Sequence, residues 1–248
     1  MKSFNYVLGM LIASPWLVLC SSGGLAAEPP KYEPITAYQA QEVEGWKVLV
    51  NKGLLEREPE LAARSLRMLE TQLYLVTQRV PEPVVKQLRE VTFWLEENEP
   101  NHPGLVYHPD PGWLRNHDIN PQKAKCIEIA NARNFIHWAK DQPWAILHEL
   151  AHAYHHQFLP DGFQNAEVRL TFEQAQREGL YDEVLHISGR RRKHYALTNE
   201  KEYFAESSES YFGTNDFSPF VRAELREHDP RMYRLLERLW KPQQPSEE

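Results

Sequence analysis

The hydrophobic and polar positions along this chain predict strands with one long helix in the first half and helices in the second half. Leucines and a valine recur at helical spacing over 58–80, which predicts a helix that Pro81 and Pro83 end. Short runs rich in β-branched and aromatic residues predict strands over 43–50, 91–95, 105–107 and 126–130.

The second half is expected to contain three helices. An apolar-rich helix covers about 144–158, with Asp141 as its N-cap and Pro143 in its first turn. The two later helices have the expected ranges 199–212 and 230–240, the latter with Asp229 as its N-cap. Strands followed by helices indicate an α+β domain, in which a small mixed sheet packs beside a helical C-terminal lobe.

Residues 1–27 have the pattern of a secretory signal peptide. A charged start and an apolar run precede small residues, and either Ala26 or Ala27 can be the cleavage point. The run is too short to span a bilayer comfortably, so we expect a secreted or periplasmic protein with no membrane attachment after cleavage. Lipid attachment at Cys20 is the less favoured alternative, because Leu19 is bulky where such a signal usually has a small residue.

The remaining chain is expected to be a single domain, 28–248, because no linker or low-complexity break interrupts it before Lys241. Its parts are a Pro-rich leader over 28–34, mainly sheet and helix over 35–140, and an active-site helix with a helical lobe over 141–240.

Composition narrows the classes of protein that fit. The 248 residues are 42% hydrophobic and 25% charged, which excludes a disordered chain. The formal net charge of −7 gives no electrostatic basis for binding nucleic acid. Signal cleavage would leave Cys126 as the single thiol, so an exported domain would depend on its core or on a metal rather than on a disulfide. The eleven histidines are the unusual feature.

The motif H-E-x-x-H occupies 148–152 within the predicted helix of 144–158. His148 and His152 are one turn apart on the same face, so both imidazoles can reach one zinc ion at about 2.0–2.1 Å. Glu149 then projects beside the metal, where it can take a proton from a zinc-bound water. The alternative is an amphipathic helix that carries two histidines by chance, but the apolar neighbours predict a mostly buried helix, where imidazoles need a partner.

A catalytic zinc site needs a third protein ligand. The extended pattern with a downstream Gly and His is excluded, because His155 and Phe158 stand at those two positions. The helix that begins at Asn199 is the richest source of carboxylates, and its Glu202 and Glu206 share one face. Spacing alone leaves an alternative open, in which Glu202 completes a capping box with Asn199 and the other acids are solvated.

The segment 195–206, Tyr-Ala-Leu-Thr-Asn-Glu-Lys-Glu-Tyr-Phe-Ala-Glu, resembles the anthrax lethal factor-like zinc metallopeptidases, which are zincins of the gluzincin type. In that family a tyrosine, a Thr-Asn-Glu-x-Glu run, two aromatic residues and Ala-Glu follow an H-E-x-x-H helix at a similar distance. The match covers two short segments. It implies a zincin-like fold, in which an edge strand near 126–130 holds the substrate backbone. Other domains and the substrate-docking apparatus of lethal factor are missing, so its substrate is not carried over.

The resemblance also implies individual roles. Glu202 corresponds to the third zinc ligand and Tyr195 to the catalytic tyrosine, whose hydroxyl can donate to the oxyanion formed in peptide hydrolysis. Glu206 corresponds to a carboxylate behind the ligands, where it can accept the second ring N–H of His148 or His152. One zinc ion per chain is expected.

Most other histidines receive no chemical role. His155 and His156 continue the active-site helix and are expected to be surface or structural residues. His186, His194 and the basic run 189–193 are expected to form a solvated loop near the site. The basic run is an alternative determinant for acidic substrates, although a plain solvated loop is favoured.

The sequence therefore predicts a secreted zinc metallopeptidase that acts on a peptide or protein substrate. Two alternatives remain: a catalytically silent zinc-binding interaction or toxin-like module on a zincin scaffold, and a metal-free exported protein with an accidental motif. The sequence specifies neither the peptide bond cleaved nor an oligomeric state.

Overall fold

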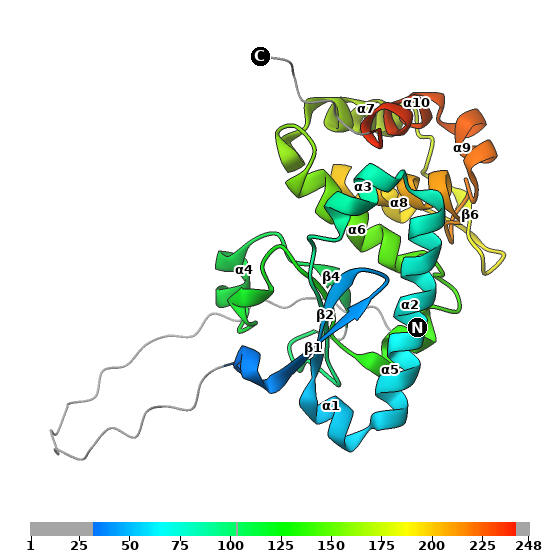
Figure 1. Ribbon diagram of the computed structural model, residues 1–248. Helices are drawn as coiled ribbons and strands as arrows, with labels where there is room; N and C mark the ends of the chain where they lie inside the picture. The colour runs from blue at the N-terminus through cyan, green and yellow to red at the C-terminus, as the bar shows by residue number, and fades with distance from the viewer. Residues whose placement is uncertain (1–31, 103, 242–248) are drawn as a thin grey trace, which may run out of the picture. The chain divides into compact units, whose positions relative to one another are not determined.

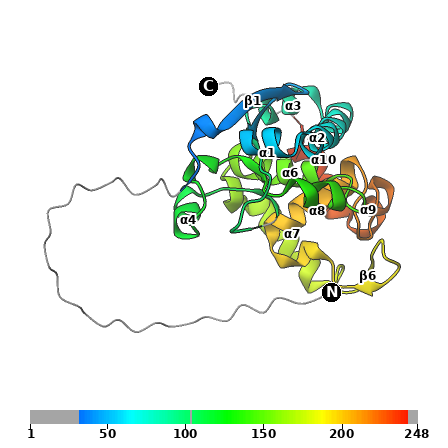
Figure 2. The same cartoon turned by 90° about the horizontal axis from the view of Figure 1, so that it is seen from below.

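The computed structural model describes residues 32–102 and 104–241, which Figures 1 and 2 show in two perpendicular views. The predicted signal peptide, Cys20 and leader residues 28–31 lie outside this range. No helix among the described residues is long and apolar enough to cross a membrane. The described chain combines a five-stranded mixed sheet, a two-stranded sheet and many helices, which confirms the α+β class.

The sheet begins with a hairpin where the sequence predicts one strand over 43–50. Strand β1 (Tyr38–Val43) pairs antiparallel with β2 (Trp46–Asn51). The two residues between them, Glu44 and Gly45, have φ angles of 51° and 86°. A two-residue loop with positive φ at both positions matches the twist of the strands it joins. The single-strand prediction is therefore wrong, because the turn at Glu44 and Gly45 lies inside the predicted range and joins two strands.

The other three predicted strands are confirmed. Strand β3 (Phe93–Leu95) runs parallel to β2, β5 (Ile127–Ile129) runs parallel to β3, and β4 (Leu105–Tyr107) runs antiparallel to β5. The order is β1-β2-β3-β5-β4. Among the described residues β1 and β4 are therefore the two edges of this sheet, and the expectation of an edge strand near 126–130 is wrong. That expectation came from the resemblance, whereas β5 is an inner strand whose polar residue, Glu128, is buried.

The predicted long helix is confirmed as α2 (Pro59–Arg79), which buries Leu69, Leu73 and Val76 in the core. Its side chain Gln72 accepts the N–H of Ile146 at 3.1 Å, at the start of the motif helix α6 (Ala145–Gln157). The predicted N-cap Asp141 is wrong: α6 begins after Trp144, which makes no side-chain cap. The cap comes from a distant helix, which local sequence cannot reveal.

The second half forms the predicted helical lobe (Figure 1). The predicted helices are confirmed as α6, α8 (Glu200–Phe212) and α10 (Pro230–Leu239). Asp229 caps α10 as expected, accepting the N–H of Met232. Helices α7 (Ala166–Arg177) and α9 (Arg222–His228) were not predicted. Figure 1 shows α7 and α10 on the side of α6 and α8 away from the sheet.

Shorter elements complete the described chain. They are helices α1 (Lys52–Arg57), α3 (Glu82–Leu88), α4 (Pro111–Asn116) and α5 (Ala132–Trp138), strands β6 (Val184–Leu185) and β7 (Arg191–Arg192), and 3-10 helices Ile35–Ala37, Pro121–Lys123, Gly162–Gln164 and Tyr195–Thr198. Pro81 does end α2, but it also precedes α3, which has Pro83 in its first turn.

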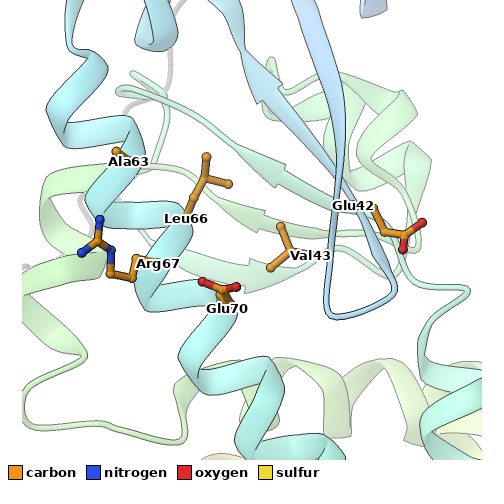
Figure 3. A pocket seen from close by; sticks show the side chains of 6 residues that line it. All are labelled: Glu42, Val43, Ala63, Leu66, Arg67 and Glu70. Atoms are coloured by element: carbon orange, nitrogen blue, oxygen red, sulfur yellow. The ribbon is translucent and has the colours of Figure 1, made fainter.

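A small open pocket lies between β1 and α2 (Figure 3). It is lined by Glu42, Val43, Ala63, Leu66, Arg67 and Glu70. None of these residues belongs to the predicted site, so this pocket lies apart from that site.

His155 is a structural residue at the centre of the helical lobe. Its side chain is fully buried between the rings of Phe163 and Phe204, at centroid distances of 5.1 and 4.9 Å. Neither ring nitrogen has a hydrogen-bond partner among the described residues. Burial lowers the pKa of His155 to about 3, so the folded protein keeps this imidazole neutral.

We expect His155→Leu to reduce the loss of stability in acid. Below pH 6.5 the unfolded chain binds a proton at this histidine, whereas the folded protein does not until about pH 3. The folded state therefore loses stability as pH falls, by about 2 kcal/mol at pH 5 from this residue alone. Urea unfolding at pH 8 and pH 5 measures the difference between wild type and variant. The exposed His137, replaced in His137→Leu, is the control. Equal losses in wild type and His155→Leu contradict the assignment.

Candidate metal centre

Helix α6 places the two motif histidines side by side. The Nε2 atoms of His148 and His152 lie 3.1 Å apart, and their rings meet edge to face. The side chains are only 12% and 11% exposed. Fully buried Leu147, Leu150 and Ala151 anchor the helix in the core. The one-turn spacing thus produces the convergence that the sequence predicts.

Helix α8 brings Glu202 to the same point. Its Oε2 atom lies 3.1 Å from His148 Nε2 and 3.2 Å from His152 Nε2. Asn199 caps α8 by accepting the backbone N–H groups of Lys201 and Glu202. The Glu202 carboxylate itself faces the imidazoles. In the capping-box alternative it would reach back to the backbone of Asn199.

These three ligand atoms fit a zinc ion. They form a nearly equilateral triangle with sides of 3.1, 3.1 and 3.2 Å. Ligands about 2.1 Å from a tetrahedral ion lie about 3.4 Å apart, so a small outward movement would admit the ion. Two imidazoles and one carboxylate are also the donor set of many catalytic zinc sites, which leaves one position for water.

The charges around the triangle favour a cation. Burial lowers the pKa of His148, but contacts with Glu202 and Glu209 outweigh this and raise it well above its usual value. Burial acts against ionisation of Glu202, yet the two histidines hold its pKa well below the usual range. The carboxylates therefore attract positive charge, as a proton on His148 or as a metal ion in its place.

The motif acid Glu149 lies next to the triangle and contacts the sheet edge. Its Oε2 atom accepts the backbone N–H of Tyr107, the last residue of β4, at 2.7 Å. Burial raises the pKa of Glu149, with the charges of His148 and His152 acting in the opposite direction. A carboxyl with a raised pKa suits the uptake and release of a proton near neutral pH.

The carboxylate closest to the second ring nitrogen of His148 differs from the predicted one. Its Nδ1 atom lies 2.7 Å from Glu209 Oε1 and 3.5 Å from Glu206 Oε1. The direct partner is therefore Glu209, not Glu206. Glu206 instead accepts from Asn215 Nδ2 at 2.8 Å. The sequence assigns no role to Glu209, although its spacing of seven residues from Glu202 places both on one face of α8.

The electrostatic surroundings of Glu206 act against its charged form. Burial, and then the charge of Glu209, raises the pKa of Glu206 well above its usual range. His194 Nδ1 lies 3.7 Å from its other side, at Oε2. Glu206 thus belongs to a polar network behind the triangle, and its contact with the ring of His148 is longer than that of Glu209.

Tyr195 lies on the 3-10 helix Tyr195–Thr198 and is 50% exposed. Burial of its inner half, and then the charge of Glu202, raises the pKa of its hydroxyl, with His148 acting in the opposite direction. Its hydroxyl is therefore within electrostatic range of the triangle. No hydrogen bond from this hydroxyl is present among the described residues, so the ring is free to meet a ligand.

The segment before Tyr195 differs from the solvated loop that was expected. Strands β6 and β7 pair there, although most of 182–193, including the basic run, is exposed as expected. His194 is buried and accepts the N–H of Ala196, while His186 forms an ion pair with Asp216 at 3.4 Å. The two histidines are therefore structural residues that support the start of the Tyr195 segment.

Comparisons with protein-family models, with curated proteins and with solved structures found no match for this chain.

We expect Glu209→Gln to weaken zinc binding by about tenfold or more, because the partner of a ligand histidine orients its ring and raises its basicity. Glu206→Gln is the matched control on the same helix. Glu206 lies 3.5 Å from His148 Nδ1, against 2.7 Å for Glu209, so this change should affect zinc affinity much less. Competition with a fluorescent chelator measures both affinities. A larger loss for Glu206→Gln would reverse the assignment.

Proposed function

We propose that this chain is a secreted or periplasmic zinc metallopeptidase of the lethal factor-like, gluzincin type. The observation that carries the proposal is the convergence of His148, His152 and Glu202, from two helices, within 3.2 Å of one another. Glu149 lies next to this triangle, as the motif chemistry requires. Export is proposed from the N-terminal sequence pattern alone.

The proposed chemistry is hydrolysis of a peptide bond by water. A bound zinc ion would lower the pKa of its water to about 7 and polarise the substrate carbonyl. Glu149 takes a proton from the attacking water and later gives it to the leaving amine. Tyr195 donates its hydroxyl to the oxygen that becomes negative during attack. Glu209 keeps the ring of His148 in a fixed orientation through its Nδ1 atom.

The sheet edge is the proposed binding place for the substrate backbone. Among the described residues β4 has a neighbour on one side only, and Tyr107 directs its N–H away from β5 to Glu149. An extended peptide that pairs with this edge would pass beside the motif acid. Side-chain preference would then come from the surrounding loops, including the exposed basic run at β7.

We expect Glu149→Gln and Glu202→Ala to separate catalysis from metal binding. Glu149→Gln should keep the zinc and lose hydrolysis of a peptide library, because it removes only the base. Glu202→Ala should lose both, because it removes a ligand. Elemental analysis and mass spectrometry of the digest measure the two properties. A zinc-bound wild type that cleaves no peptide would support the silent interaction module instead, and a metal-free protein would overturn the proposed site.

We expect Tyr195→Phe to lower kcat by roughly 10²–10³-fold, the usual effect of removing one oxyanion donor. The melting temperature should stay unchanged, since the ring is half exposed and its hydroxyl makes no hydrogen bond with the described residues. Zinc content should also stay unchanged. Unaltered turnover would remove Tyr195 from the mechanism, and a lower zinc content would assign it to metal binding.

A further inference from the structure

A second group of metal-ligating side chains lies on the sheet, separate from the triangle at α6. His102 precedes β4, His108 follows it, and Glu128 is the central residue of β5. The Oε2 atom of Glu128 lies 3.0 Å from His102 Nε2 and 2.6 Å from His108 Nε2. The three ligand atoms lie within 4.8 Å of one another. We call this group the sheet triad. It shares no residue with the candidate metal centre.

The arrangement repeats that of the candidate metal centre. In each group a single carboxylate oxygen lies within 3.2 Å of two Nε2 atoms. In each group the carboxylate is strongly shielded from water, with the Glu128 side chain 0% exposed and the Glu202 side chain 17% exposed. Imidazole and carboxylate together are a donor set that suits zinc.

Glu128 is an ionised carboxylate in a buried position. Burial alone would raise its pKa, but hydrogen bonds from His102 and His108 and the charge of Lys123 hold the pKa well below the usual range. The ammonium of Lys123 contacts the other carboxylate oxygen, Oε1. Oε2 therefore faces the two imidazoles alone.

The surroundings of the sheet triad contain more carboxylates than ammonium groups, although burial raises the pKa of Glu96 and so acts against its negative charge. Lys123 also contacts Glu96 at 2.8 Å and Glu99 at 3.4 Å, so one ammonium serves three carboxylates. All four side chains are at most 16% exposed. Uncompensated charge in such a place is costly, which favours a further cation beside Glu128. A divalent ion supplies the missing charge at the point where three ligand atoms already meet.

We propose that His102, His108 and Glu128 bind a second zinc ion, whose role is structural. It would join both ends of the edge strand β4 to the inner strand β5. That strand carries Tyr107, whose N–H holds Glu149. The sheet triad would therefore fix the position of the strand beside the proposed catalytic acid, in a domain whose described cysteine, Cys126, is a free thiol.

Protonation of both histidines is the competing explanation, because two imidazolium ions would supply the same charge. The two explanations differ in metal content. A bound zinc ion must be lost when the imidazoles are removed, whereas protonated imidazoles leave the zinc content of the protein unchanged.

The test counts zinc in the purified full chain after chelation, reloading with zinc sulfate and removal of free ion. We expect two zinc ions in the wild type and one in His102→Ala/His108→Ala. His148→Ala/His152→Ala should also retain one, at the sheet triad. His137→Ala, which changes an exposed histidine outside both groups, should retain two. Melting temperatures with and without zinc show whether the second ion stabilises the fold.

Each outcome distinguishes this proposal from the peptidase proposal. One zinc ion in the wild type that is lost only in His148→Ala/His152→Ala overturns the second site and leaves the metal centre intact. One zinc ion in the wild type that is lost only in His102→Ala/His108→Ala overturns the candidate metal centre and supports the site at the sheet triad. If the double variant does not fold, His102→Ala alone is informative, since that side chain is 20% exposed. Undiminished zinc content in this variant overturns the proposal.

Discussion

The packing of α6 against α8 is the contact on which the rest of the described structure depends. It places two imidazoles of one helix against the carboxylates of another, and aromatic side chains pack around the two helices. Tyr154 of α6 stacks on Trp240 at 4.4 Å and donates its hydroxyl to Leu239. At the other end of the pair, Gly213 has no side chain where the Trp144 indole lies, and any Cβ there would overlap the ring. Close packing therefore fixes the helices in one register.

The edge strand β4 connects this helix pair to the sheet. Tyr107 makes two contacts with α6: its N–H donates to Glu149, and its hydroxyl lies 2.8 Å from His156 Nδ1. His108, the next residue, contacts Glu128 on the neighbouring strand. Two consecutive residues at the end of β4 thus contact the helix and the sheet beside the proposed substrate edge. A displacement of this strand would alter the sheet triad and the position of Glu149 together.

Buried negative charge is the common feature of the two groups. Glu209 and Glu206 lie behind His148, while Glu96 and Glu99 lie beside Glu128. Different groups offset this charge: burial raises the pKa of Glu206, the ammonium of Lys123 contacts Glu128, and imidazoles face carboxylates in both groups. Four of the histidines lie in these two groups, where an imidazole can offset negative charge either by carrying a proton or by binding a metal ion.

Local sequence was sufficient for the features that depend on spacing along one element. It predicted α2, α8 and α10, and the motif residues of α6, because helical periodicity and caps such as Asn199 and Asp229 act within a few residues. The resemblance, rather than spacing, singled out Glu202. Tertiary structure decided the features that depend on contacts between distant segments. These are the pairing of β1 with β2, the cap that Gln72 provides for α6 and the position of β4 at an edge of the sheet. They also include the contact of Glu209 with His148 and that of Glu128 with His102. Periodicity shows which face of an element is buried, but only packing of the whole chain decides which side chains share that interior.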